Sequence, residues 1–259
     1  MLPNFLIIGV QRGGTTSLYK YITKHPKIIP ALKKEIHFFD IKFQKGISWY
    51  QSQFKQNLFF TLLYKKKKFE DSITGEASPY YIYHPHVPKR ISKIIPDVKL
   101  IVLLRDPIER AFSHYHHERR LGIEKLSFED AIKEEPKRLS GELEKMLVDE
   151  NYYSFNHQHF SYLERGIYVE QLVRWEKFFP KKQILVLSSN EFYSEPTKIC
   201  NQVFDFLNLG NYSFDEIKTY NKGKYKSINE NTQKMLVEYF TPHNEKLYDF
   251  LKRDFNWNR

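Results

Sequence analysis

The sequence of 259 residues contains a single cysteine, Cys200, and no apolar run long enough to cross a bilayer. One cysteine excludes an intrachain disulfide and favours a reducing compartment. The apolar run at the start also lacks the basic segment and small-residue cleavage site of a signal peptide. Internal repeats and low-complexity linkers are absent. These absences predict a cytoplasmic protein without stable membrane insertion, folded as one domain over residues 1–259, and they leave the oligomeric state open.

The chain is basic, with 41 Lys and Arg against 31 Asp and Glu and a net charge of +10. Such an excess favours anionic partners, but it does not separate nucleic acid from a phosphorylated or sulfated ligand. No recognised nucleic-acid module is present, so nucleic acid is not the expected partner. The densest basic run, Lys65 to Lys68, is expected to be a solvated loop.

Short apolar runs alternate with segments of helical pattern. Phe5–Val10 and Lys99–Leu104 are typical of parallel strands buried on both faces, and Ile184–Leu187 and Ser72–Glu76 are further strands. This alternation predicts an α/β fold with a central parallel sheet flanked by helices. The expected helices are Thr15–Lys24, Trp49–Phe54, Val87–Ile95, Arg110 to about Leu121, Leu163–Phe179, Pro196–Leu207, Asn229–Phe240 and Pro242–Leu251.

Two of the expected helix boundaries have specific signals in the sequence. Asp106, Pro107 and Glu109 stand at the cap, first and third positions of a predicted helix, which is a strong helix start. Near the end of the chain, Pro242 is expected to separate two helices, with Thr241 capping the second. The stretch 141–162 has no clean period and is expected to be a substrate loop or an irregular connection.

The first strand leads into a glycine loop, Gly9 to Gly14, with the glycine spacing of a Walker A loop. The lysine and the hydroxyl residue that should follow would stand at the positions of Thr15 and Thr16, so the lysine is missing. The nearest cation is Arg12 inside the loop. A turn made only for packing is the alternative. Three hydroxyls on one helical turn, ending at Ser17, favour phosphate binding at a helix N-terminus.

Several further blocks follow in order along the chain: Lys34–Asp40, Lys45-Gly46 with Trp49-Tyr50, Gly75–Tyr80, Leu103–Ser113, Gly166–Phe179 and Tyr239–Tyr248. Together with the loop Gln11–Leu18, they resemble sulfotransferases that use 3′-phosphoadenosine 5′-phosphosulfate (PAPS). The heparan-sulfate N- and O-sulfotransferase branch is the most similar. The resemblance implies a P-loop-type domain that moves a sulfuryl group in line from PAPS to a hydroxyl or amine, with no metal.

The resemblance also implies the residues that hold the donor. The glycine loop and its helix would bind the 5′-phosphosulfate, a second group the 3′-phosphate, and a basic glycine loop would close over the nucleotide. Arg12 stands where the family usually has lysine; it keeps the charge but cannot release its proton near neutral pH. Its expected role is therefore charge stabilisation alone. The donor-binding residues are Arg12, Gly13, Gly14, Thr15, Thr16, Ser17, Arg105, Ser113, Lys222, Gly223 and Lys224.

The block Lys34–Asp40 supplies the acid–base candidates. Glu35 is expected to be the general base, provided that burial raises its pKa toward working pH. His37 is the second candidate, and in an extended segment the two side chains point to one side. The alternatives are an ion pair of Glu35 with Lys33 or Lys34 and a structural histidine.

The acceptor is the most open part of the prediction. Ala77 stands where the heparan-type enzymes usually carry a lysine that anchors an anionic acceptor or the sulfo group. A hydroxyl of a glycan or lipid-linked sugar is expected, and an amine or a small metabolite stays open. A P-loop nucleotide or metabolite kinase is the alternative enzyme, and a basic nucleic-acid binder is the third possibility. The chain is expected to be a bacterial-type enzyme or a trimmed catalytic domain.

Overall fold

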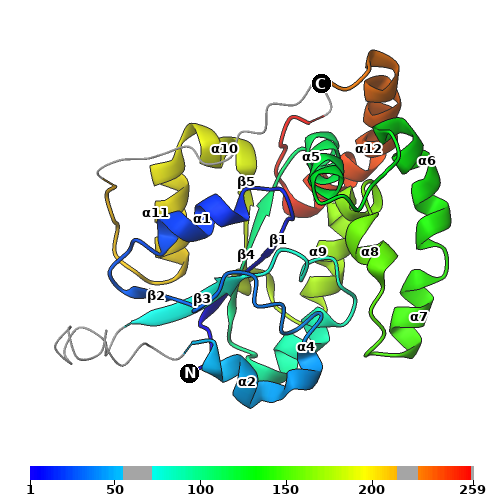
Figure 1. The fold of residues 1–259 in the computed structure, drawn as a ribbon. Coiled ribbons are helices and arrows are strands. Elements are labelled where there is room, and N and C mark those ends of the chain that lie inside the picture. Colours follow the sequence, from blue (N-terminus) through cyan, green and yellow to red (C-terminus); the bar gives the residue numbers. More distant parts are fainter. Residues whose placement is uncertain (55–71, 215–226, 258–259) are drawn as a thin grey trace. The chain divides into compact units, whose positions relative to one another are not determined.

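The structure, a computed structural model, describes residues 1–54, 72–214 and 227–257 (Figure 1). The chain groups into two compact units. Unit 1 comprises Met1–Leu104 and Phe178–Tyr220, and unit 2 comprises Arg105–Lys177 and Asn221–Arg259. This grouping does not test the expectation of one functional domain, which stays a prediction.

Unit 1 contains the sheet. Within the described ranges its five strands are all parallel, in the order β2-β3-β1-β4-β5. The predicted α/β fold with a central parallel sheet flanked by helices is confirmed. The short strand β2 was not expected from the sequence. The strands are β1 (Phe5–Gly9), β2 (Ile28–Pro30), β3 (Ile73–Ala77), β4 (Lys99–Leu104) and β5 (Ile184–Ser188).

Strand β1 is the centre of the sheet, with every residue buried. It pairs with β3 on one side, where Phe5 is opposite Gly75, and with β4 on the other, where Phe5 is opposite Lys99. Phe5 and Ile7 belong to one apolar core together with α1 and α11. Burial on both faces explains why this strand has no polar alternation in the sequence.

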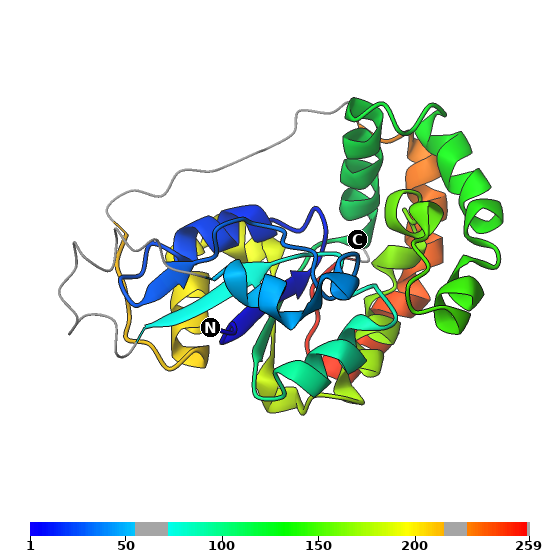
Figure 2. The same cartoon turned by 60° about the horizontal axis from the view of Figure 1, so that its bottom comes forward.

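The helices of unit 1 pack against the sheet and connect its strands. Figure 2 shows α1 beside α11, and side chains of both belong to the core that also contains Phe5 and Ile7. Helix α10 begins directly where β5 ends and was not expected from the sequence. The helices are α1 (Thr15–Ile22), α2 (Gly46–Ser52), α4 (Val87–Ile94), α10 (Ser189–Ser194) and α11 (Pro196–Phe206), with 3₁₀ turns at Phe43–Lys45 and Lys181–Gln183.

The parallel arrangement brings all the carboxyl ends of the strands to one edge of the sheet. The connection after β1 leads toward β2, whereas the chain after β4 returns as β5 on the opposite side. Ligands of open α/β sheets bind where such connections leave in opposite directions. The end of β1 and the loop that follows it are therefore the place in unit 1 where a ligand site is expected.

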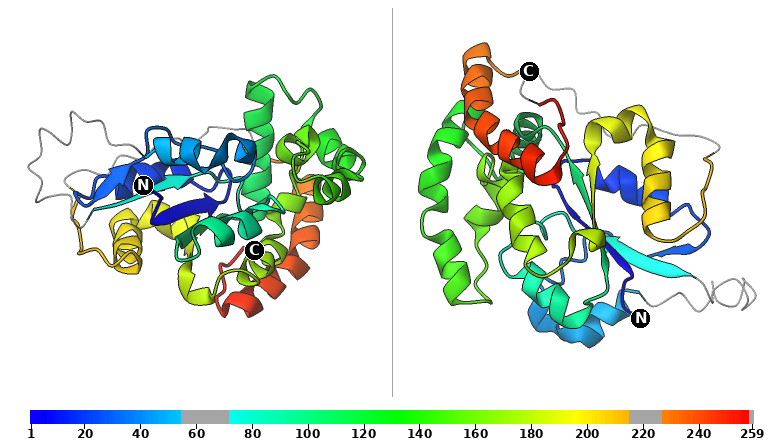
Figure 3. Two further views of the ribbon diagram at one scale, coloured as in Figure 1. Left: turned by 90° about the horizontal axis from the view of Figure 1, so that it is seen from below. Right: turned by 180° about the vertical axis from the view of Figure 1, so that it is seen from behind.

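Unit 2 is helical within its described residues. Helix α12 packs on both α5 and α9, and Figure 3 shows these helices from below and from behind. The predicted cap of α5 is confirmed, because the Asp106 carboxylate accepts hydrogen bonds from the N–H groups of Ile108 (2.8 Å) and Glu109 (3.0 Å). The helices are α5 (Pro107–Arg120), α6 (Phe128–Leu139), α7 (Glu142–Val148), α8 (Phe155–His159), α9 (Tyr168–Glu176) and α12 (Glu230–Leu251), with a 3₁₀ turn at Glu164–Gly166.

The predicted break at Pro242 is wrong. One continuous helix, α12, contains this proline, and Thr241 does not cap a new helix; its hydroxyl donates to the carbonyl of Val237 at 2.7 Å. A proline removes one backbone hydrogen bond, here the one to the carbonyl of Glu238, which is an exposed residue. The buried residues Leu236, Phe240 and Leu247 hold the helix together on both sides of the proline.

The stretch 141–162 is not an irregular connection throughout, since it contains α7 and α8. Both are short, and the Ser154 hydroxyl caps α8 by accepting from the N–H of His157 at 3.0 Å. Helices of this length give too little periodicity to be found by pattern. Among the described residues no helix has the length and apolar character needed to span a membrane.

We predict that Gly166→Ala destabilises the protein by about 1–3 kcal/mol, because overpacking forces neighbouring groups apart. A methyl group at this buried position would lie 2.7 Å from the ring of Phe240 and 3.1 Å from Pro107. Gly210→Ala is the matched control, since nothing lies within 4 Å of its added methyl. Urea unfolding of both variants measures the difference, and equal midpoints would contradict the packing argument.

Candidate active site

The glycine loop after β1 is held by backbone contacts of unit 1. The N–H of Val10 donates to the carbonyl of Leu103 (3.1 Å), and the N–H of Gly13 donates to Val10 (2.9 Å). A Cβ at Gly13 would lie 2.5 Å from the Leu103 oxygen, and one at Gly14 would lie 2.8 Å from the Tyr193 hydroxyl. Gly14 also has φ of 100°. The loop therefore requires glycine at both positions, as a close backbone approach predicts.

Helix α1 begins at the end of this loop without a side-chain cap at its N-terminus. The first N–H that bonds within the helix is that of Leu18, which donates to Gly14 at 3.0 Å. The N–H groups of Thr15 to Ser17 precede it, and the helix dipole adds positive potential there. Thr15 and Ser17 are each only 4% exposed, whereas Thr16 is half-buried. Of the three hydroxyl side chains in this candidate anion cradle, that of Thr16 is thus the most accessible.

Arg12 and α10 flank the cradle. Arg12 is half-buried and has φ of 69°, in the left-handed region that non-glycine residues rarely adopt. The buried Ser189 at the start of α10 donates its hydroxyl proton to the carbonyl of Gly13 at 2.7 Å. Neither Ser189 nor Tyr193 was predicted from the sequence, because only the return of β5 to this edge of the sheet brings them to the loop.

The acid–base candidates form a charged cluster in unit 1. The Nδ1 of His37 lies 2.7 Å from the Asp40 carboxylate, and its Nε2 lies 3.5 Å from the Glu35 carboxylate. The Lys34 ammonium pairs with the other oxygen of Glu35. The Asp40 side chain is fully buried, whereas 41% of the Glu35 side chain is exposed. The structure therefore brings Glu35 and His37 together and adds Asp40, which stands three residues after His37 in the sequence.

The pKa values of Glu35 and His37 depend more on the neighbouring charges and hydrogen bonds than on burial. Burial acts to raise the pKa of Glu35, but the hydrogen bond from His37 and the charges of Lys34 and His37 lower it to about 2. Burial acts to lower the pKa of His37, but hydrogen bonds and charges of Asp40 and Glu35 raise it to about 10. The condition set for Glu35 as a general base, a pKa raised by burial, is therefore not met in the structure. Glu35 is ionised, and His37 carries a proton between two carboxylates.

The segment 34–40 is fixed to the end of β3. The Glu35 N–H donates to the carbonyl of Ala77 at 3.1 Å, so the residue in the family's lysine position contributes its backbone. The fully buried Glu76 carboxylate and the Tyr81 hydroxyl accept further N–H groups of the segment. Glu76 was not predicted from the sequence, where its signal is an ionisable side chain inside a short strand.

The same part of unit 1 also contains an indole ring with two lysines near it. The Nζ atoms of Lys42 and Lys45 lie 5.9 and 5.0 Å from the centre of the Trp49 ring. Burial and the charges of Lys33 and Lys45 lower the pKa of Lys42. Like charges gathered on an aromatic face attract an anionic or polar ligand.

The other residues predicted to bind the sulfuryl donor lie partly in unit 2 and partly outside the described residues. In unit 2, Arg105 directly follows β4 and donates to one oxygen of Glu109 from Nε (3.1 Å) and Nη2 (2.9 Å). Ser113 is 4% exposed and stands four residues after Glu109 on α5, so both lie on one helical face. Lys222, Gly223 and Lys224 lie outside the described residues.

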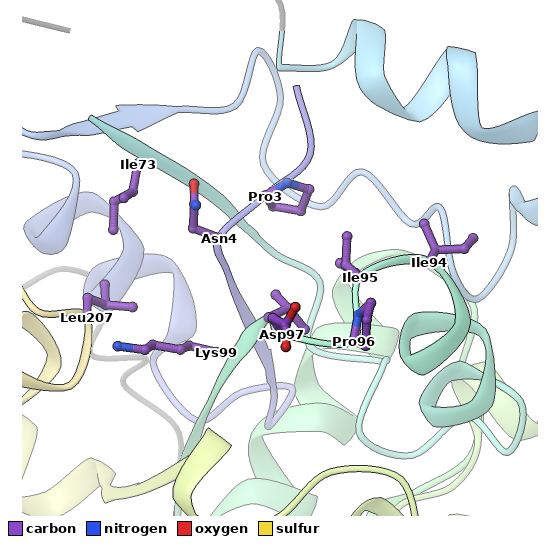
Figure 4. Close-up of a pocket in the computed structure, with 10 residues that line it drawn as sticks. Pro3, Asn4, Ile73, Ile94, Ile95, Pro96, Asp97, Lys99 and Leu207 are labelled. Carbon is purple, nitrogen blue, oxygen red and sulfur yellow. The ribbon is translucent and has the colours of Figure 1, made fainter. Parts of the chain in front are cut away.

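Two further observations delimit the site. Where the structure is described, no group of three or more His, Cys, Asp or Glu side chains could hold a metal ion. A cavity of about 410 Å³ in unit 1 (Figure 4) lies at the amino ends of the strands, where Asn4, Ile73 and Lys99 line it. The cradle follows the carboxyl end of β1, at the opposite edge of the sheet. This cavity is therefore separate from the candidate active site.

Comparison with known proteins agrees with this geometry. Residues 2–252 match the family model described as "Sulfotransferase domain". Over 99% of its length the chain is 31% identical to the membrane-associated sulfotransferase kil1 of Dictyostelium discoideum, and 30% identical to human heparan sulfate glucosamine 3-O-sulfotransferase 3B1. It covers 66% and 65% of these two relatives, just under two thirds of their length.

A solved structure extends the comparison to the fold. The crystal structure of a sulfotransferase from Alicyclobacillus acidocaldarius superposes with a TM-score of 0.74 at 26% identity, covering 100% of both chains. A solved protein described as a sulfotransferase therefore has a fold similar to that of this chain.

We predict that the Glu35–His37 pair makes stability depend on pH. The lowered pKa of Glu35 contributes stability above its ordinary value of 4.5, which is lost as pH falls toward about 2. The raised pKa of His37 contributes stability below its ordinary value of 6.5, which is lost as pH rises through about 10. The free energy of unfolding should therefore differ most between wild type and His37→Gln in the window between those two ordinary values. Urea unfolding from well below pH 4.5 to well above pH 6.5 measures it, and a difference that stays constant over that whole range would contradict the pairing.

Proposed function

We propose a specific reaction for this chain, which belongs to the sulfotransferase family and is a transferase: it moves the sulfuryl group of PAPS to a hydroxyl of a glycan-like acceptor. One observation carries the proposal. An uncapped helix N-terminus follows the carboxyl end of β1, and a charged acid–base cluster is hydrogen-bonded to the carboxyl end of the adjacent strand β3. A transfer site needs an anion cradle for the donor and a proton acceptor for the hydroxyl.

The cradle is proposed to hold the 5′-phosphosulfate. The N–H groups of Gly13 to Ser17 would donate to its oxygens, and Arg12 would stabilise the charge that develops on the leaving oxygen. When bound, PAPS supplies the sulfuryl group, whose transfer resembles phosphoryl transfer in needing mainly positioning and charge stabilisation. The absence of a Walker lysine supports this assignment over a kinase, and no metal is proposed.

The 3′-phosphate is proposed to bind Arg105 and Ser113. The Arg105 guanidinium already donates from Nε and Nη2 to one carboxylate oxygen of Glu109, and the same two nitrogens could donate to phosphate oxygens. Glu109 would release it when the nucleotide binds. The loop Lys222 to Lys224 is proposed to contribute further positive charge. Residues 1–259 are proposed to act as one sulfotransferase domain.

Glu35 is proposed to take the proton of the acceptor hydroxyl. It is ionised and partly exposed, so it can accept a proton, but its two ion pairs make it a weak base. An acceptor hydroxyl that displaces Lys34 or moves His37 would raise the pKa of Glu35 and strengthen it as a base. His37, protonated and held by Asp40, would orient Glu35. Trp49 with its two lysines supports a sugar with polar or anionic substituents.

We predict that adenosine 3′,5′-bisphosphate, the nucleotide product, raises the melting temperature of the protein, because it binds the folded state alone. At 100 times its dissociation constant, the stabilisation is about 2.7 kcal/mol. Adenosine 5′-monophosphate is the control for the 3′-phosphate and should stabilise less. Stabilisation by MgATP with no response to the bisphosphate would instead favour a nucleotide kinase.

We predict that Glu35→Gln lowers kcat for sulfuryl transfer by roughly 10²–10⁴-fold, since this is the usual contribution of a general base. Binding of the bisphosphate should stay unchanged. Mass spectrometry of products from labelled PAPS and a panel of glycans, lipids and phenols identifies an acceptor for the assay. An unchanged kcat in the folded variant would exclude Glu35 as the base.

A further inference from the structure

Five consecutive N–H groups, those of residues 35–39, all donate outside their own segment. Their acceptors lie on β3 or in the turn that follows it, so the backbone that carries both acid–base residues is held by one neighbouring strand. The donor and acceptor pairs are Glu35 with the Ala77 carbonyl (3.1 Å), Ile36 with Glu76 (3.3 Å), His37 with the Ser78 hydroxyl (3.2 Å), and Phe38 (2.9 Å) and Phe39 (3.3 Å) with the Tyr81 hydroxyl.

The segment needs this support because its backbone is strained. Glu35 has φ of 61° and His37 has φ of 55°, both in the left-handed region. For residues with a Cβ this conformation costs roughly 1–2 kcal/mol each. It persists only where the surroundings determine the backbone. The positions of the two acid–base side chains therefore depend on the acceptors that hold residues 35–39.

Glu76 decides how those acceptors are oriented. Its fully buried carboxylate accepts the hydroxyl protons of Ser78 (2.7 Å) and Tyr81 (2.9 Å), and also that of Tyr50 (2.8 Å). A hydroxyl has one proton to donate, so donation to Glu76 leaves the lone pairs of Ser78 and Tyr81 for the N–H groups of the segment. The carboxylate thus fixes the direction of two hydroxyls that hold three of the five N–H groups.

We propose that Glu76 is a positioning residue for transfer, acting through Ser78 and Tyr81 to hold Glu35 and His37 in their reactive arrangement. This inference rests on the proposed function, because it assumes that Glu35 and His37 serve the reaction. Glu76 is fully buried beneath the segment and is bound to three hydroxyls and one N–H. It therefore acts through its neighbours and does not touch the acceptor.

Two tyrosine variants separate positioning from stability. Tyr81→Phe removes a buried hydroxyl that donates to Glu76 and accepts from Phe38 and Phe39. Tyr19→Phe is the matched control: its buried hydroxyl donates to Gly75 (2.9 Å) on the same strand and accepts from Ala31 (2.9 Å), and neither partner belongs to residues 35–39.

The first readout is the titration of the His37 ring, followed by NMR. In wild type, Glu35 and Asp40 keep His37 protonated far above its ordinary pKa. If Tyr81 positions the segment, its loss lets Glu35 move away, and the midpoint falls toward the ordinary value, whereas Tyr19→Phe leaves it unchanged. The charged side chains of the segment and its neighbours are all retained in both variants: Lys34, Glu35, Asp40, Lys42, Glu76 and Arg90.

The second readout is steady-state kinetics. Tyr81→Phe should lower kcat roughly 10–100-fold, the effect expected from misplacing a reacting group by about 1 Å, with bisphosphate binding unchanged. Glu76→Gln should lower it at least as far, and Tyr81→Phe keeps the test valid if the glutamine variant does not fold. Tyr19→Phe should keep the kcat of wild type.

Equal His37 titrations and equal kcat values in the two tyrosine variants would overturn the proposal. A shifted titration with unchanged kcat would overturn it too, because such positioning has no part in turnover. If wild type transfers no sulfuryl group, the proposed function fails, while the His37 titration still decides whether the Glu76 cluster holds the segment.

Discussion

The arrangement of unit 1 depends on strand β1, which is hydrogen-bonded on both sides and buried on both faces. Because β3 and β4 run parallel to it, the chain leaves all three strands at one edge of the sheet. The loop after β1 must then pass within contact distance of the Leu103 carbonyl, where only glycine fits. The same constraint places the end of β3, with Ala77 and Ser78, where the segment 34–40 can bind it.

Electrostatics then determines the chemical state of the acid–base residues. Burial alone would make Glu35 a stronger base and His37 a weaker one, as in many buried sites. Here Lys34, His37, Glu35 and Asp40 form alternating charges, and their pairing outweighs the loss of hydration. The ion pairs of this cluster stabilise the fold, and they also make Glu35 a weaker base. In the proposed reaction, an acceptor that breaks one of these pairs would change both properties together, so acceptor binding and activation of Glu35 would be linked.

Local sequence predicted those parts of the fold that local physics decides. The apolar runs of β1 and β4 and the cap of α5 at Asp106 are confirmed, since continuous burial and capping leave direct signals over a few residues. The helix break at Pro242 is wrong because the packing of Leu236, Phe240 and Leu247 outweighs one lost hydrogen bond. The short helices α7 and α8 contain too few turns to show a period.

The sequence by itself determined the glycine cradle, the presence of Glu35 and His37 in one segment, and the family to which the ordered motifs belong. It could do so because each of these depends on residues that are close in the chain. Only the tertiary structure decided that Glu35 is ionised with a lowered pKa, that Asp40 completes the cluster, and that Glu76, Ser78 and Tyr81 hold it. The first two depend on how the backbone of residues 34–40 folds, whereas the third joins groups about forty residues apart. Those groups meet because β2, which lies just before the segment, pairs with β3.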